Sequence, residues 1–176
     1  MSRPESMPAL VGGVLAVEQS LDGGTFVGVR AAPLADGRLG VEVAFMARAE
    51  SDAWARVEAI MEDRQVALAV GATLQLHVPV ALTARSQSVG QAELGKGAGL
   101  VRSMILAGKV VHRGEQLLAE HVDRCVPVTF PSGGQAPSQS RSPGPIELAR
   151  CMIWAVALAS KPQARRVKPR IVSSTA

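Results

Sequence analysis

The stretch from Gly12 to Met46 constrains the fold of this chain more than any other part of the sequence. Three apolar segments in it have the length of a β-strand: Val14–Ser20, Thr25–Ala31 and Leu39–Met46. An Asp-Gly pair stands in each of the two gaps, at Asp22-Gly23 and at Asp36-Gly37. Such pairs favour tight hairpin turns, because glycine adopts positive φ without steric cost. The stretch therefore predicts an antiparallel meander of three strands.

The rest of the chain alternates between helical and extended patterns. Apolar residues at helical spacing predict helices that begin near Ser51 or Asp52, at Leu100–Leu106, at Glu115–Cys125 and at Ile146–Ala159. Extended segments are predicted at Gln65–Val70, Val78–Thr83 and Lys109–His112. The first of these is wholly apolar, which is typical of a parallel or central strand. A polar, glycine-rich connection is expected over 86–99, and a Pro-, Gly- and Ser-rich loop over 126–145. Together these patterns predict an α/β fold with a mixed sheet covered by helices.

The length of 176 residues and the charge distribution indicate a single domain with a basic end. We expect a disordered leader at 1–11, a globular domain at 12–160 and a disordered tail at 161–176. The net charge of +4 comes from this tail, which holds no acidic residue and five basic ones: Lys161, Arg165, Arg166, Lys168 and Arg170. They are candidate DNA-binding residues, or else a solubilising end. No apolar run reaches a membrane span and no signal peptide begins the chain, so we expect a cytoplasmic protein.

A glycine-rich motif at Gly90–Gly97 raises the possibility of nucleotide binding. It matches the G-x-x-x-x-G-K part of a phosphate-binding loop, with Lys96 as the residue that would reach the phosphates. Gly97 stands where such a loop carries the hydroxyl that holds Mg²⁺. A flexible connection is the alternative interpretation.

Carboxylates at the strand ends make a metal-dependent phosphodiester site the second candidate. Two Mg²⁺ or Mn²⁺ ions need several carboxylates from different elements. Glu18 ends the first strand and is the candidate catalytic residue and metal ligand, and Glu147 in the last helix is a second candidate ligand. The end of the Gln65–Val70 strand offers no carboxylate. His77, His112 and His121 show no zinc-ligand spacing.

The order of these features resembles the C-terminal nuclease domain of the large terminase subunit of tailed phages, particularly of actinobacteriophage type. The matching pieces are LAVEQSLDGGTFVGVRAA, DGRLGVEVAF, VALAV, ILAGKVVHRGEQLLAEHVDR and SPGPIELARCMIWAVALA. The resemblance covers roughly 12–160 and implies a ribonuclease-H-like fold: a meander, then parallel strands and helices. It implies a two-metal DNA endonuclease using Mg²⁺ or Mn²⁺, if the chain is active.

The departures from this pattern predict impaired cleavage. Glu18 falls at the family's first metal-binding acid, whereas the second would fall at Ala69 and the third near Ser142. The family's packaging ATPase domain is not part of this sequence. The resemblance thus implies a phage or prophage protein related to DNA packaging, with DNA, a separate packaging ATPase or other packaging proteins as partners. The alternative is a non-catalytic structural, DNA-binding or partner-binding module.

Overall fold

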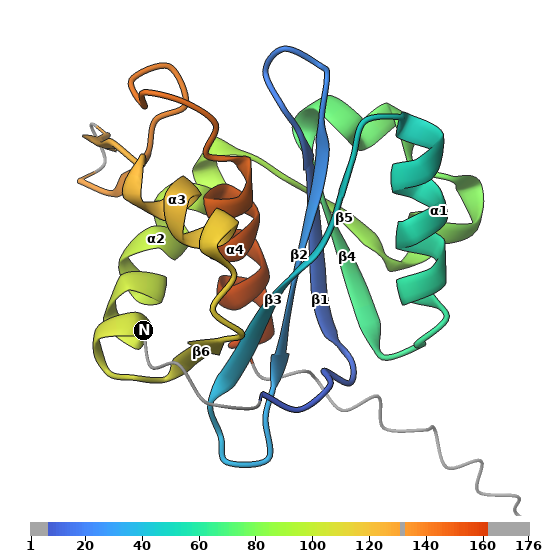
Figure 1. Ribbon diagram of the computed structural model, residues 1–176, viewed down its shortest axis with the longest axis horizontal. Coiled ribbons are helices and arrows are strands. Elements are labelled where there is room, and N and C mark those ends of the chain that lie inside the picture. Colours follow the sequence, from blue (N-terminus) through green and yellow to red (C-terminus); the bar gives the residue numbers. More distant parts are fainter. Residues whose placement is uncertain (1–6, 131–132, 162–176) are drawn as a thin grey trace, which may run out of the picture.

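A computed structural model describes residues 7–130 and 133–161 of the chain. Its centre is a six-stranded mixed sheet with the strand order β5-β4-β1-β2-β3-β6. The strands are β1 (Gly13–Gln19), β2 (Phe26–Pro33), β3 (Leu39–Ala47), β4 (Val66–Gly71), β5 (Ser86–Val89) and β6 (Val110–His112). Helices cover both faces of this sheet (Figure 1). The predicted α/β fold, with a mixed sheet covered by helices, is confirmed.

The predicted meander forms strands β1, β2 and β3. β1 and β2 pair antiparallel from Val14 opposite Ala31 to Gln19 opposite Phe26, and β2 pairs antiparallel with β3. The turns contain Gly23 at φ +72° and Gly37 at φ +81°, the left-handed conformation that the Asp-Gly pairs predict.

The remaining strands run parallel to their neighbours. β4 lies between β1 and β5 and is parallel to both, and β6 is parallel to β3 at the other edge. All residues of β4 except one are buried, as its apolar sequence predicts. The carboxyl ends of β1, β4 and β5 therefore meet at one end of the sheet. This is where open α/β sheets commonly place their binding sites.

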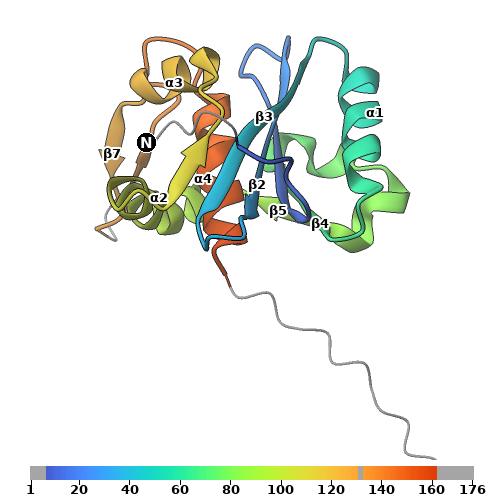
Figure 2. The same ribbon diagram turned by 60° about the horizontal axis from the view of Figure 1, so that its bottom comes forward.

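The helices divide into two layers. α2 (Gln91–Leu106), α3 (Gln116–Asp123) and α4 (Glu147–Ala159) lie on one face, and α1 (Glu50–Met61) lies on the other, as both views show (Figures 1 and 2). α4 packs directly against β1 and β2 and is buried along almost its whole length. This burial explains why the helix is apolar nearly all round.

Each face of the sheet has its own apolar core. One core joins alternate residues of β1, including Val14 and Ala16, to α4, α2 and α3. The other joins Leu15 and Val17 to Val57 and other residues of α1. The alternation along β1 follows from the period of two in a strand. Side chains at positions 14, 16 and 18 therefore face the α4 layer.

Several local elements predicted from the sequence differ from the elements observed. The prediction of a strand at Val78–Thr83 is wrong. Most of this segment belongs to the 3₁₀ helix η2 (Val80–Arg85), which follows the 3₁₀ helix η1 (Ala72–His77). Pro79 lies between these helices and has no amide hydrogen to give a sheet partner. The fifth strand is instead the polar segment β5, and its place at the sheet edge explains its polarity.

Two other segments are more ordered than their composition suggests. α2 begins at Gln91 and not at Leu100, so the glycine-rich segment is helical. The expected loop at 126–145 contains a small hairpin of β7 (Pro127–Thr129) and β8 (Gln135–Pro137). At α1 the N-cap residue is Ala49, so neither Ser51 nor Asp52 caps that helix as predicted.

The disordered leader predicted at 1–11 extends too far along the chain, because Met7 and Leu10 belong to the fold. Met7 and Leu10 are buried in a small cluster with Ala32 and Val111, which links the start of the described chain to β2 and β6. Burial of these two apolar side chains is favourable and holds the segment against the sheet. Residues 1–6, the rest of this predicted leader, lie outside the described residues.

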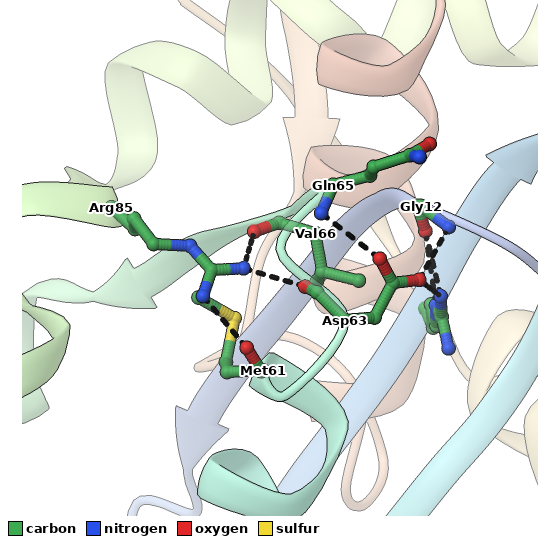
Figure 3. Close-up of polar contacts among 7 residues, drawn as sticks. Gly12, Met61, Asp63, Gln65, Val66 and Arg85 are labelled. Atoms are coloured by element: carbon green, nitrogen blue, oxygen red, sulfur yellow. Dashed lines mark hydrogen bonds and ion pairs between the residues drawn. The ribbon is translucent and has the colours of Figure 1, made fainter.

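A polar cluster ties the amino ends of β1 and β4 to the end of α1 (Figure 3). One oxygen of Asp63 accepts hydrogen bonds from the Gly12 amide at 2.7 Å and from Arg30 at 3.0 Å, and the other accepts from the Gln65 amide. These bonds, with that of Gly12 the largest contribution, lower the pKa of Asp63. Arg85 donates to the carbonyl oxygens of Met61, Asp63 and Val66. The guanidinium thus joins the last carbonyl group of α1, at Met61, to the turn at Asp63 and to the start of β4 at Val66.

The helical glycines of α2 allow a matched pair of substitutions. A Cβ at Gly97 would lie 3.0 Å from the Ala157 Cβ and 3.3 Å from the Ile153 Cγ2 of α4, whereas a Cβ at Gly99 would meet nothing within 4 Å. We expect Gly97→Leu to lower the free energy of unfolding by about 1–3 kcal/mol through overpacking. Gly99→Leu, at a position with open space, is expected to raise it by about 0.5–1 kcal/mol through helix propensity. Urea unfolding of both variants measures the difference, and equal effects would contradict the close contact of α2 and α4.

Candidate functional site

The candidate site lies at the carboxyl ends of β1, β4 and β5. β1 brings Glu18 to this end on the face covered by α4. The first two turns of α4 bring Glu147 and Arg150 to the same place, one helical turn apart. All three side chains are buried, with exposed fractions of 6% for Glu18, 4% for Glu147 and 8% for Arg150. Charged residues are rarely buried to this degree without a partner.

Glu18 and Arg150 form a buried bidentate ion pair. The Arg150 Nε lies 2.9 Å from Glu18 Oε2 and 3.1 Å from Oε1, and a terminal nitrogen of Arg150 lies 2.7 Å from Oε1. Both carboxylate oxygens therefore accept hydrogen bonds from one guanidinium, a geometry that gives strong and directional pairing. The pair connects residues 132 positions apart in the sequence and fixes α4 against the end of β1.

Two further contacts hold the Arg150 side chain. Its second terminal nitrogen donates to Gln91 Oε1 of α2 at 3.2 Å. Its guanidinium carbon lies 5.1 Å from the centroid of the Trp154 ring, within the range of a cation–π interaction. Trp154 is itself fixed, because its indole nitrogen donates to the Gly90 carbonyl at 3.2 Å. The cation is thus held from three sides.

Glu147 supplies a second negative charge beside this pair. Its Oε1 accepts a hydrogen bond of 2.9 Å from the Gln139 side chain. Desolvation by burial raises the pKa of the Glu18 carboxyl, the hydrogen bonds and charge of Arg150 oppose this, and the charge of Glu147 adds to it. The charge of Glu147, at the start of α4, thus acts on Glu18 in the same direction as burial. Glu18 and Glu147 carry two negative charges against the single positive charge of Arg150.

A small cavity opens beside the ion pair. Its volume is about 270 Å³, and its lining includes Glu18, Arg150, Gln91 and Gln139 as well as residues of the β1–β2 turn. The lining gives the cavity polar atoms from four separate parts of the chain. A small polar group could therefore reach the ion pair from solvent.

The structure does not bring a full set of acidic ligands to this place. Ala69, the position expected for the second acid, pairs with Ala16 in the middle of the sheet and is fully buried. The β4 residue beside Glu18 is Gly71. A Cβ added at this glycine would lie 3.2 Å from the Glu18 Cγ. Ala69 thus offers no ligand at this end of the sheet, and Gly71 has no carboxylate either.

Ser142, near which the third acidic ligand is expected, offers no carboxylate and bonds within its own loop. The Ser142 hydroxyl accepts from the Val126 amide at 3.1 Å and donates to the Ser138 carbonyl at 2.7 Å, so it holds the loop before α4. Over residues 7–130 and 133–161, no group of three His, Cys, Asp or Glu side chains is placed to hold a metal ion. Because Arg150 also occupies both oxygens of Glu18, these residues do not fit the metal pair that the resemblance implies.

The glycine-rich motif reaches this site only through Gly90 and Gln91, at the start of α2. Gly90–Gly97 is not a phosphate loop, because Gly90 is the N-cap of α2 and the following residues form its first turns. This removes the backbone cradle that nucleotide binding at Lys96 would need. Of the proposed DNA-binding residues, Lys161 is exposed, and Arg165, Arg166, Lys168 and Arg170 lie outside the described residues.

The three histidines have separate local partners. His77 lies 2.7 Å from Glu50, and His112 accepts a hydrogen bond from the Gly114 amide. The buried His121 of α3 accepts a hydrogen bond of 3.2 Å from the Leu148 amide at the start of α4. Ile146, the N-cap residue of α4, has no acceptor in its side chain, so His121 satisfies an amide that would otherwise be free.

The His121 contact predicts a pH dependence of stability. Desolvation by burial lowers the pKa of His121, and Arg124 acts in the same direction while Glu147 and Glu120 oppose it. A folded-state pKa below the unfolded value means that this stability is present above about pH 6.5 and is lost as the pH falls towards the folded-state pKa. We expect Tm to fall over this range more steeply in the wild type than in His121→Asn, since one proton changes the free energy of unfolding by at most about 1.4 kcal/mol per pH unit. Parallel Tm profiles for the two proteins would contradict the assignment.

Comparison with solved structures identifies the fold. The chain superimposes on the crystal structure of the HK97 bacteriophage large terminase with a TM-score of 0.70 and 18% sequence identity, over 88% of this chain and 40% of that chain. This chain thus spans less than half the length of that terminase. The likeness confirms, at the level of the fold, the resemblance that the sequence suggests.

Two nuclease structures give weaker matches. The large terminase nuclease from thermophilic phage G20c matches with a TM-score of 0.47 and 14% identity, over 85% of this chain and 92% of that chain. The Thermus phage P74-26 large terminase nuclease domain matches with a TM-score of 0.46 and 13% identity, over 83% and 77%. No protein-family model matches the sequence, and no curated protein matches it. None of the helices in the described ranges is both long and apolar enough to cross a membrane.

Proposed function

We propose that this chain is a terminase nuclease-like protein, related to phage DNA packaging, whose metal-dependent DNA cleavage is impaired. The observation that carries this proposal is the Arg150 guanidinium, which is paired with both oxygens of Glu18. The fold shared with the HK97 large terminase supports the first part of the proposal. The second part is supported by residues 7–130 and 133–161, in which no group of three His, Cys, Asp or Glu side chains is placed to hold a metal ion.

Elementary electrostatics explains why this arrangement disfavours cleavage. Mg²⁺ gives up its water reluctantly, so carboxylates must offset the cost of its dehydration. Here one carboxylate is neutralised by a fixed cation, and repulsion between that cation and an entering metal ion would oppose binding. The step that such metals provide, stabilisation of the attacking and leaving oxygens, would then be lost.

A non-catalytic module that binds DNA or a packaging partner is the alternative, and the basic tail favours it. Five neutralised phosphates would give a slope of about −4 to −5 in a plot of log K against log salt concentration. Fluorescence anisotropy with duplex DNA measures this slope, and its loss when all five residues are replaced would identify the tail as the contact. A slope near zero in the wild type would exclude the tail as a DNA-binding arm.

The proposal also implies a place and partners for the protein. A chain of this type would act in the cytoplasm of the bacterial host, with DNA, a packaging ATPase and other phage packaging proteins as partners.

A plasmid-nicking assay with Mn²⁺ tests the proposal. We expect folded wild-type protein to leave supercoiled plasmid intact and to show no rise in Tm with Mn²⁺. Glu18→Ala is the control, because cleavage from a contaminating nuclease would persist in that variant. Cleavage by the wild type that disappears in Glu18→Ala would overturn the proposed impairment and identify Glu18 as a working ligand.

A further inference from the structure

We infer that the cavity between α2, α3, α4 and the β7–β8 hairpin is a binding site for a small aliphatic carboxylate, with Arg102 as the residue that pairs with the carboxylate group. The volume of this cavity is about 490 Å³. Small-molecule sites usually measure roughly 300–1,000 Å³ and are mostly apolar. Neither Glu18 nor Arg150 belongs to the lining, so this cavity is separate from the candidate site described above.

Three helices form the walls of the cavity. α2 contributes Val101 and Ile105, four residues apart, and α4 contributes Ala149 and Ile153 at the same spacing. Residues four apart lie on one face of a helix, so each pair forms an apolar stripe. Val122 of α3 and residues of the β7–β8 hairpin complete the lining. The apolar body of a ligand would therefore contact side chains on several sides.

Close backbone contacts keep this space open. A Cβ at Gly97 would lie 3.0 Å from the Ala157 Cβ, and a Cβ at Gly134 would lie 3.2 Å from the Gly95 carbonyl oxygen. α2 therefore already touches both α4 and the hairpin, and it cannot move closer to fill the cavity. Ala98 follows in α2 and lines the cavity, but its methyl group is too small to fill it.

The charge distribution matches a ligand with one anionic end. Arg102 is the single charged residue among the described residues of the lining, and its side chain is exposed. Within residues 7–130 and 133–161 it forms no hydrogen bond or ion pair. Burial raises the pKa of the Cys125 thiol to about 11, so this group of the wall is neutral. The cavity thus combines uncharged walls with one free cation at its rim, the arrangement that an apolar anion requires.

A compact ligand suits this surface better than a protein partner does. Specific protein interfaces take roughly 800 Å² from each partner. The apolar surface here is the lining of one cavity, extended at the rim by Leu106, which is 78% exposed. An alkyl chain can enter between the helices and also cover this leucine.

Isothermal titration calorimetry of the full chain with decanoate tests the inference. Decyltrimethylammonium is the matched ligand, because it has the same alkyl chain and the opposite charge. We expect decanoate to bind about tenfold more tightly, the effect of one charge-assisted pair at an exposed arginine. Arg102→Glu should reverse this order. Lys96→Glu makes the same charge change at an exposed residue of α2 outside the lining, and should keep the wild-type order.

Alkylation of the cysteines by iodoacetamide locates the bound ligand. Cys125 lines the cavity and is partly exposed, whereas Cys151 is fully buried, and mass spectrometry distinguishes the two. The reaction is followed at about pH 9, because only the thiolate reacts. We expect decanoate at about ten times its Kd to slow alkylation of Cys125 about tenfold, since about nine-tenths of the sites are then filled.

A filled cavity should no longer bind the ligand. Ala98→Leu adds side-chain volume inside the lining and should weaken decanoate binding at least about tenfold. Ala92→Leu makes the same change at an exposed residue of α2 outside the lining, and should leave binding unchanged. If Ala98→Leu does not fold, the exposed Arg102→Glu variant and the protection of Cys125 still decide.

Each contrary result overturns the inference. Such results are a wild type that binds neither ligand, an unchanged ligand order in Arg102→Glu, and a reversed order in Lys96→Glu as well. Decanoate binding that leaves Cys125 unprotected would place the ligand elsewhere. Equal affinity in folded Ala98→Leu and in the wild type would show that the cavity is not the site.

Discussion

Replacement of Glu18 with alanine should lower the free energy of unfolding by about 3–5 kcal/mol, because it leaves the buried Arg150 guanidinium without its counter-charge. Arg150 is only 8% exposed, so little water can reach it in compensation. Its remaining contacts, to Gln91 and the Trp154 ring, involve neutral groups. Urea unfolding monitored by tryptophan fluorescence measures the change.

A double substitution separates the charge effect from packing. Glu18→Leu combined with Arg150→Met removes both charges and keeps apolar volume, so we expect most of the lost stability to return. If the double variant is as unstable as Glu18→Ala, the effect lies in packing and the ion pair has no special role. A loss below about 1 kcal/mol in Glu18→Ala would mean that Arg150 finds another partner or reaches solvent.

Trp154→Ala is expected to cost about 3–5 kcal/mol, the usual range for removal of a buried Trp or Phe. Trp154 is 1% exposed in the core between α4 and the sheet, and its indole nitrogen donates to the Gly90 carbonyl. Its removal would leave a cavity and free the Arg150 guanidinium from the ring. The same unfolding experiment, monitored by circular dichroism, measures the loss.

Trp154→Phe is the matched variant for this position. It keeps an aromatic ring under Arg150 but loses the hydrogen bond to Gly90, and we expect a cost of about 1–2 kcal/mol. Equal losses for alanine and phenylalanine would place the whole effect in that hydrogen bond. The order in which the two variants lose stability thus reports how much the ring itself contributes.

The fold could be predicted where local signals agree with tertiary structure. The Asp-Gly turns and the alternating strands predict β1 to β3 within one or two residues, and the apolar β4 is also correct. The errors fall where tertiary context decides. Glycines at 95, 97 and 99 suggest a loop, but the segment is helical, and at Gly97 the close approach of α4 favours a small residue. β5 is polar because it lies at the edge, which no local pattern indicates.

The candidate site could be predicted only in part. Glu18 and Glu147 follow from strand-end and helix-start positions, and the structure brings both to one end of the sheet. Arg150 was missed, although a signal for it exists. The helix at 147–159 is otherwise apolar, and a lone cation in an apolar helix needs a buried counter-charge. The sequence could not identify that partner, because Glu18 lies 132 residues away.

The position of α4 has a consequence for synthesis of the protein on the ribosome. The meander of β1 to β3 emerges first, but α4, which covers one face of β1 and β2, is the last described element to appear. Until then Val14, Ala16 and Val29 present an apolar sheet face to the cell. Nascent chains with such exposed surface are prone to aggregate, so this fold should depend on chaperones that bind extended apolar segments during translation. The Glu18–Arg150 pair would then be one of the final contacts to form.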